Sequence, residues 1–149
     1  MDLKTVAYRA GLVKFRVPSD WVEEYDEDGG GAWFADVPDS GTLRLAVETF
    51  QGPALPPASD LLRALKDRPN PAELLPNGVA FVAYSQDVEE EGEALSIRYW
   101  DLAQAVAPKH LRLVQFSYTL PRRRVEDPAV VEELVMLERF TGWWCRSCS

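Results

Sequence analysis

Apolar and polar residues alternate along several stretches of the chain, which is the pattern of a half-buried β-strand. Within residues 12–17, Val13, Phe15 and Val17 share one face and basic residues share the other. Short turns and loops connect most of these stretches, so we expect a mostly antiparallel sheet. Comparable runs predict further strands at 32–37, 42–50, 79–88, 93–106 and 110–120.

The predicted strand at 93–106 carries apolar residues on both faces. Tyr99 ends one apolar row, whereas Trp100 and Leu102 belong to the opposite row. A bulge within the strand would produce this change of face, and so would a sheet that is covered on both sides.

Two helices are predicted in addition to the strands. Ser59 is placed to cap a short helix at 60–67. Asp127 and Pro128 have the residue types favoured at the N-cap and the first position of a second helix. Gly142 is the natural residue to end that helix. The apolar faces contain Leu61, Leu62 and Leu65 in the first helix and Val130, Leu134 and Leu137 in the second.

The length and the charge of the chain narrow the class of protein. Its 149 residues suit one domain with a sizeable core, and we assign residues 1–142 to a single α+β domain and 143–149 to a C-terminal tail. The formal net charge of −8 disfavours binding to nucleic acid or to anionic membranes, whereas it suits a basic protein partner. The sequence begins without the apolar core of a signal peptide and contains no apolar run of about 18 residues, so we expect a cytoplasmic protein.

The C-terminal tail contains Cys145 and Cys148 in a CxxC pattern, which occurs in redox sites and in zinc sites. Both cysteines follow the C-terminal end of the predicted helix, where the helix dipole disfavours a thiolate. A closed zinc site needs four ligands, and one chain supplies these two cysteines and at most His110. We therefore expect an inert tail, no cofactor and no metal, with a redox or zinc-binding function as the alternative.

The sequence offers little support for a catalytic site or a calcium site. His110 has no companion nucleophile motif, so we predict no catalytic residues. The acidic runs at 23–28 and 87–93 lack the ligand spacing of a calcium loop and are interpreted as solvated faces, which would also attract a basic partner.

The tryptophans give the best indication of a binding surface. Trp21 and Trp33 flank the first acidic run, and exposed aromatic residues often mark protein contacts. We predict a partner-contact surface made of Trp21, Tyr25, Trp33 and Phe34. The alternative interpretation is that the two tryptophans close the core beneath the loop.

The stretch "LVKFRVPSDW" resembles the opening of the PsbP-like superfamily, which includes a photosystem II extrinsic subunit and a Ran-binding import factor. The resemblance rests on Phe15, Val17, Pro18 and Trp21, and extends to "GTLRLAVETF" and "LRLVQFSYTL". It implies an antiparallel sheet between helices, and adaptor or chaperone roles rather than catalysis.

Together these observations predict an α+β fold with a mostly antiparallel sheet of about six strands, flanked by helices as an α/β/α sandwich. The predicted function is a non-catalytic protein-interaction domain of adaptor or chaperone type. Its expected partner is a protein, with a basic one favoured by the acidic charge of the chain, and the chain is expected to be a monomer or a homodimer.

Overall fold

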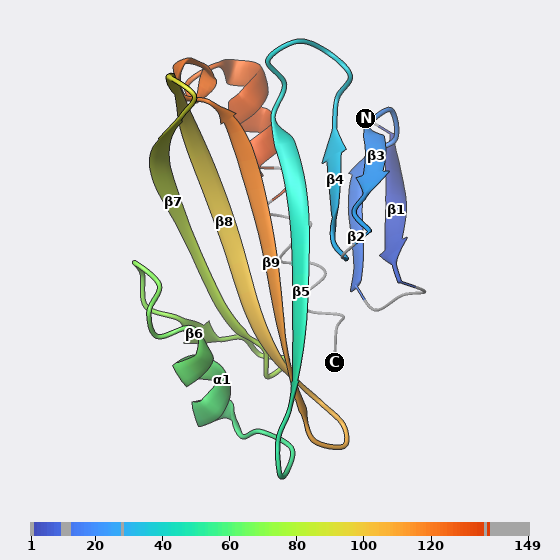
Figure 1. The fold of residues 1–149 in the computed structure, drawn as a ribbon, viewed down its shortest axis with the longest axis vertical. Helices are drawn as coiled ribbons and strands as arrows, with labels where there is room; N and C mark the ends of the chain where they lie inside the picture. Colours follow the sequence, from blue (N-terminus) through green and yellow to red (C-terminus); the bar gives the residue numbers. More distant parts are fainter. Residues whose placement is uncertain (1, 10–12, 28, 136, 138–149) are drawn as a thin grey trace.

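The computed structural model describes residues 2–9, 13–27, 29–135 and 137, and the alternating stretches form antiparallel strands in it. Within these residues, seven strands form one sheet in the order β3-β4-β5-β9-β8-β7-β6, and β1 and β2 form a separate pair (Figure 1). The expected α+β fold with a mostly antiparallel sheet is confirmed. The strands are β1 (Leu3–Tyr8), β2 (Val13–Pro18), β3 (Val22–Tyr25), β4 (Gly31–Phe34), β5 (Thr42–Gln51), β6 (Glu73–Leu74), β7 (Ala80–Glu90), β8 (Glu93–Val106) and β9 (His110–Pro121).

The described residues contain more strands than the sequence predicts, because β1, β3 and β6 are additional. The segment of β3 is interpreted from its sequence as part of an exposed acidic loop, yet it pairs with β4 over its whole length. All four of its side chains are exposed, so the sequence has no apolar alternation to reveal the strand. β6 consists only of Glu73 and Leu74, which is too short to produce a pattern.

The large sheet is covered on both faces. On one face, Trp100, Phe116 and Tyr118 are buried against residues of the β1–β2 pair. On the other face, helix α1 (Ala58–Ala64) and the turn after it bury Leu61 and Leu65 against the sheet; we call this the α1 face. Figure 1 shows α1 and the β1–β2 pair on opposite sides of the long strands. The residues that the long strands contribute to the α1 face include Ala80, Val82, Tyr84, Asp101, Ala103 and Gln115.

The two covered faces explain the change of apolar face along β8. This strand pairs with β7 and β9 in continuous register, without a bulge. Tyr99 packs at the α1 face, whereas Trp100 and Leu102 are buried in the opposite cluster. Of the two interpretations of residues 93–106, the sheet covered on both sides is confirmed.

One of the two helices begins where the sequence predicts, and the other does not. Residues 128–135 are helical, and the Ala129 N–H donates to Asp127 Oδ1 at 3.0 Å, which confirms Asp127 as the N-cap. The start of α1 is corrected, because the helix begins at Ala58, after Pro57, and no side chain of the described residues caps it. Ser59 therefore lies inside the helix. Gly142 and the tail at 143–149 lie outside the described residues.

Candidate functional site

The predicted contact surface at Trp21 and Trp33 is corrected by the structure. The side chains of Trp21 and Trp33 are only 4% and 0% exposed. Trp33 packs edge-to-face on Phe15 with ring centroids 4.8 Å apart, and Trp21 stacks on Tyr118 at 6.3 Å. Both tryptophans are core residues, so the alternative interpretation of them is confirmed. Of the four predicted contact residues, Phe34 is half-buried and Tyr25 is 56% exposed.

A buried polar cluster on the α1 face is the main feature that the sequence interpretation misses. Asp101 lies in the middle of β8 and is 1% exposed, the only buried charged side chain among the described residues. Arg68, in the loop after α1, donates from Nε to Asp101 Oδ2 at 2.8 Å. The Tyr84 hydroxyl, on β7, donates to the same oxygen at 2.7 Å. Gln115, on β9, donates to the Tyr84 oxygen at 3.5 Å. Side chains from β7 and from the loop after α1 thus donate directly to one carboxylate on β8, and Gln115 of β9 joins the cluster through Tyr84.

The surroundings raise the pKa of two members of this cluster, Tyr84 and Arg68. Burial raises the pKa of Tyr84, and the hydrogen bond to Asp101 raises it further, so the hydroxyl remains a donor. For Arg68, burial opposes the charged form, but the hydrogen bond and the charge of Asp101 outweigh it and raise the pKa. The cluster is therefore a stable donor–acceptor set, in which Tyr84 is poorly suited to act as a nucleophile.

A small cavity adjoins this cluster. Its volume is about 130 Å³, and Asp101, Gln115 and Glu48 supply polar groups to its wall. Asp101 Oδ1 is buried and has no hydrogen-bond partner among the described residues. Since a buried acceptor without a partner is costly, this oxygen is a candidate ligand-binding atom.

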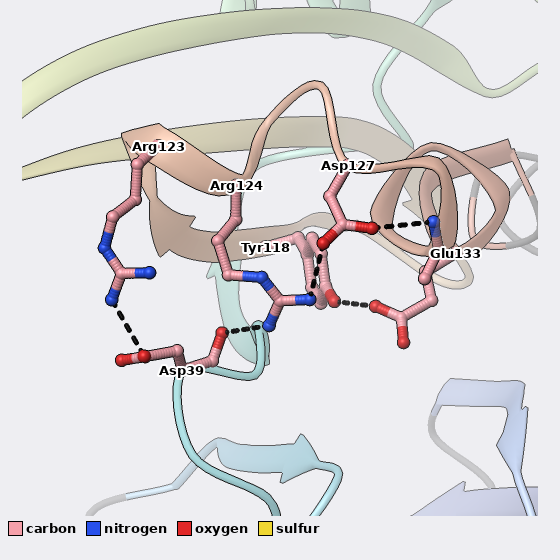
Figure 2. Close-up of polar contacts among 7 residues, drawn as sticks. Asp39, Tyr118, Arg123, Arg124, Asp127 and Glu133 are labelled. Atoms are coloured by element: carbon pink, nitrogen blue, oxygen red, sulfur yellow. Dashed lines mark hydrogen bonds and ion pairs between the residues drawn. The ribbon is translucent and has the colours of Figure 1, made fainter.

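A second polar network joins the final helix to the sheet, as Figure 2 shows. The Tyr118 hydroxyl donates to the Glu133 carboxylate, and Arg124 donates to Asp127 at 3.2 Å and to the Asp39 carbonyl at 2.6 Å. Arg123 forms an ion pair with the Asp39 carboxylate at 2.8 Å. Because the carboxylates drawn all have partners, this network is interpreted as a structural clamp.

In the part of the chain that the structure describes, the edge of the large sheet at β7 offers unpaired backbone groups. Among the described residues, β6 pairs with β7 only at Ala80 and Phe81, so no strand covers the outer side of β7 beyond them. Figure 1 shows β7 as the outermost strand over this part. Acidic side chains gather at the far end of β7 and in the turn into β8: Asp87, Glu89 and Glu90 lie in β7, Glu91 lies in the turn, and Glu93 begins β8.

The other predicted site residues are not brought together. His110 begins β9 and is half-buried, while Cys145 and Cys148 lie outside the described residues. Within the part of the chain that the structure describes, no group of three or more His, Cys, Asp or Glu side chains is arranged to hold a metal ion. In that same part, no helix is both long and apolar enough to cross a membrane.

Comparisons with known proteins identify the fold alone. No protein-family model and no curated protein matches the sequence. The chain is similar to a solved structure from Bacteroides thetaiotaomicron VPI-5482, with a TM-score of 0.60 and 21% identity over 82% of this chain, which spans only 43% of that protein. It is also similar to LpqN, involved in cell envelope biogenesis of Mycobacterium tuberculosis, with a TM-score of 0.61 and 12% identity over 93% of this chain and 88% of LpqN. These similarities do not bear on the PsbP-like superfamily, so that resemblance stays a prediction.

Proposed function

We propose that the protein is a non-catalytic binding domain that takes up a basic, extended segment of a protein partner along the outer edge of β7. The observation that carries the proposal is the combination, in one strand, of an uncovered backbone edge and a concentration of carboxylates. Addition of a strand to a sheet edge is a common mode of peptide recognition. The PsbP-like resemblance, with its adaptor and chaperone roles, agrees with this function.

The direction of the backbone groups supports strand addition. Asn70 Nδ2 donates to the Ala83 carbonyl from the outer side, at 2.7 Å. Because alternate residues of a strand direct their N–H and C=O groups to the same side, Ser85, Asp87 and Glu89 also direct theirs outward. These outward N–H and C=O groups can form hydrogen bonds with the backbone of an additional strand.

The charges at this edge support a basic partner. Arg122 lies 3.7 Å from Asp87, but among the described residues no ion pair within 4 Å involves Glu89 or Glu90. Their negative charge disfavours pairing between two copies of this strand, since charged edges protect against self-association. The same charge would attract lysine or arginine side chains that alternate along an extended segment.

The chemistry of the polar clusters favours binding over catalysis. Tyr84 and Tyr118 both have a raised pKa, caused first by burial, and both donate to carboxylates. Because the raised pKa makes loss of the phenolic proton unfavourable, neither hydroxyl is suited to act as a nucleophile. We also propose a cytoplasmic location. The role of LpqN in cell envelope biogenesis makes the envelope the competing location, and fractionation of the native host distinguishes the two.

The test uses a synthetic peptide in which threonine and lysine alternate, titrated into the protein and followed by amide NMR. We expect the amide signals of Ser85, Asp87 and Glu89 to shift and to exchange more slowly with solvent. Raising sodium chloride from about 50 mM to about 300 mM should weaken the binding, because the charges are exposed.

Two substitutions at one position separate the backbone from the charge. Glu89→Pro removes an outward N–H, which an edge strand tolerates, and should abolish binding. Glu89→Thr removes only the charge and should weaken binding by a few-fold. Equal effects of the two substitutions, or shifts confined to Val22–Tyr25 of β3, would contradict the proposal.

A further inference from the structure

We propose that the cavity beside Asp101 is a binding site for a primary ammonium group on a short alkyl chain. The cavity of about 130 Å³ lies on the α1 face, separate from the β7 edge, and the inference does not depend on the function proposed above. The residues that carry it are Ala46, Glu48, Leu65, Asp101, Leu113 and Gln115.

The first argument is the state of the Asp101 carboxylate. Its Oδ2 atom accepts hydrogen bonds from both Arg68 and Tyr84, whereas Oδ1 has no partner among the described residues. The side chain is 1% exposed, and the residue lines the cavity. A buried carboxylate oxygen without a partner calls for a hydrogen-bond donor, and the adjoining cavity, which Asp101 helps to line, is the space from which a bound molecule would supply one.

The charge of the wall selects a cation. Asp101 and Glu48 contribute two carboxylates, while Arg68 is the one cationic residue among those that line the cavity. An anion would be repelled by both carboxylates. The wall has too few acidic ligands for a metal ion of high coordination number, in agreement with the lack of a three-ligand group in the described residues.

The geometry of the acceptor favours ammonium over guanidinium. A guanidinium group binds best when both oxygens of a carboxylate are available to its planar fork. In Asp101 one oxygen is already occupied twice, so a single acceptor remains. An ammonium group is a compact donor that can hydrogen-bond to one oxygen and direct its other N–H groups to Gln115 and Glu48.

The remaining wall sets the length of the ligand. Leu65, Leu113 and Ala46 supply apolar surface. Because a cavity of about 150 Å³ can hold benzene, this space suits an alkyl chain of about four carbons. A larger hollow of about 260 Å³ lies beneath residues 51–57, but among the described residues that line it none has a buried polar atom without a partner.

The test is a titration of the protein with n-butylammonium chloride, followed by NMR of the amides and side chains. We expect saturable shifts at Asp101, Leu113 and Gln115, and no shifts at Ser85 or Glu89. Tetramethylammonium, which has no N–H donor, and n-butanol, which has no charge, should each bind at least about tenfold more weakly. Equal binding of n-butanol, or no saturable shift, would overturn the proposal and leave a cavity that holds only water.

The variants are chosen to separate binding from folding. Asp101→Asn should reduce affinity for n-butylammonium by about tenfold or more, but this change also alters a buried cluster. Ala46→Leu offers a second route: Ala46 is exposed and lines the cavity, so the larger side chain should fill the space and abolish binding without lowering the thermal stability. Arg44→Gln is the matched control, because Arg44 is exposed on the same strand and face but does not line the cavity. Unchanged binding in Ala46→Leu would refute the site.

The same ammonium chemistry can come from a free amine or from a lysine side chain of another protein. The peptide acetyl-Gly-Lys-Gly-amide distinguishes the two sources. Competition between this peptide and n-butylammonium would identify a lysine side chain as the ligand, whereas binding of n-butylammonium alone would identify a small amine. In either case the β7 edge is tested separately, so one proposal can fail while the other stands.

Discussion

Gly41 lies directly against the ring of Tyr118: a Cβ atom added at Gly41 would lie 2.1 Å from Tyr118 Cζ. The ring cannot move away easily, because Trp21 stacks on it and its hydroxyl donates to Glu133. Arg124 holds the preceding loop through the Asp39 carbonyl, as Figure 2 shows. The absence of a side chain at Gly41 is therefore a condition for docking the final helix on the sheet.

This contact predicts that Gly41→Ala destabilises the protein. The added methyl group overlaps a fully buried ring, and overpacking of this kind costs about 2–3 kcal/mol of unfolding free energy. Gly52→Ala is the control, because its nearest neighbours would be 3.9 Å from the new Cβ, and it should change stability by less than about 0.5 kcal/mol. Urea denaturation measures both. Similar values for the two variants would show that the Tyr118 ring can shift.

The same tyrosine predicts a loss of stability at alkaline pH. Burial, followed by the hydrogen bond to Glu133, raises the pKa of Tyr118 above its ordinary value of 10.0. In the unfolded chain the phenol therefore loses its proton at lower pH than in the fold, so the unfolded state binds fewer protons and stability falls as the pH rises above about 10. Tyr118→Phe should reduce this slope, although it removes a hydrogen bond. Unfolding free energies measured across the alkaline range check the prediction, and an unchanged slope would contradict it.

The pairing of Arg68 with Asp101 predicts a large effect of one arginine and a small effect of its neighbour. Arg68→Met leaves a buried carboxylate without its cationic partner and should lower the free energy of unfolding by about 2–4 kcal/mol. This value is smaller than that of a fully buried pair because Arg68 is partly exposed. Arg63→Met removes an exposed ion pair with Asp60 and should cost less than about 0.5 kcal/mol. Thermal and urea unfolding of the two variants provide the comparison. If both substitutions had equally small effects, the ion pair with Arg68 would not be needed to stabilise the buried Asp101 carboxylate.

The sequence predicts a strand such as β5, whose two sides differ, and misses β3, whose side chains are all exposed. Leu43, Leu45 and Val47 face the core while their neighbours in β5 do not, so that strand is evident. β3 pairs with β4 through its backbone alone and exposes every side chain, so no pattern of residues marks it. Burial of Trp21 and Trp33 depends on packing with Phe15 and Tyr118, which are distant in the sequence.

The candidate sites are less predictable than the fold for a similar reason. Asp101 occupies an inward position of a strand covered on both faces, and a charged residue in such a position is the one available signal. Its partner Arg68 is 33 residues away and lies in a loop without periodicity, so their pairing follows only from the three-dimensional fold. The open edge of β7 likewise depends on the short length of β6.

The acidic end of β7 predicts the association state of a variant. Replacing Glu89 and Glu90 with threonine removes charge from an uncovered edge and adds residues that favour strands. We expect this double variant to associate through edge-to-edge pairing in a concentration-dependent manner, as measured by sedimentation velocity. The matched control replaces Glu23 and Glu24 of β3 with threonine; Glu23 lies 3.4 Å from Lys4 of β1 and this edge is shorter, so we expect less association. Association of the β3 variant alone would identify β3, rather than β7, as the edge that the carboxylates protect.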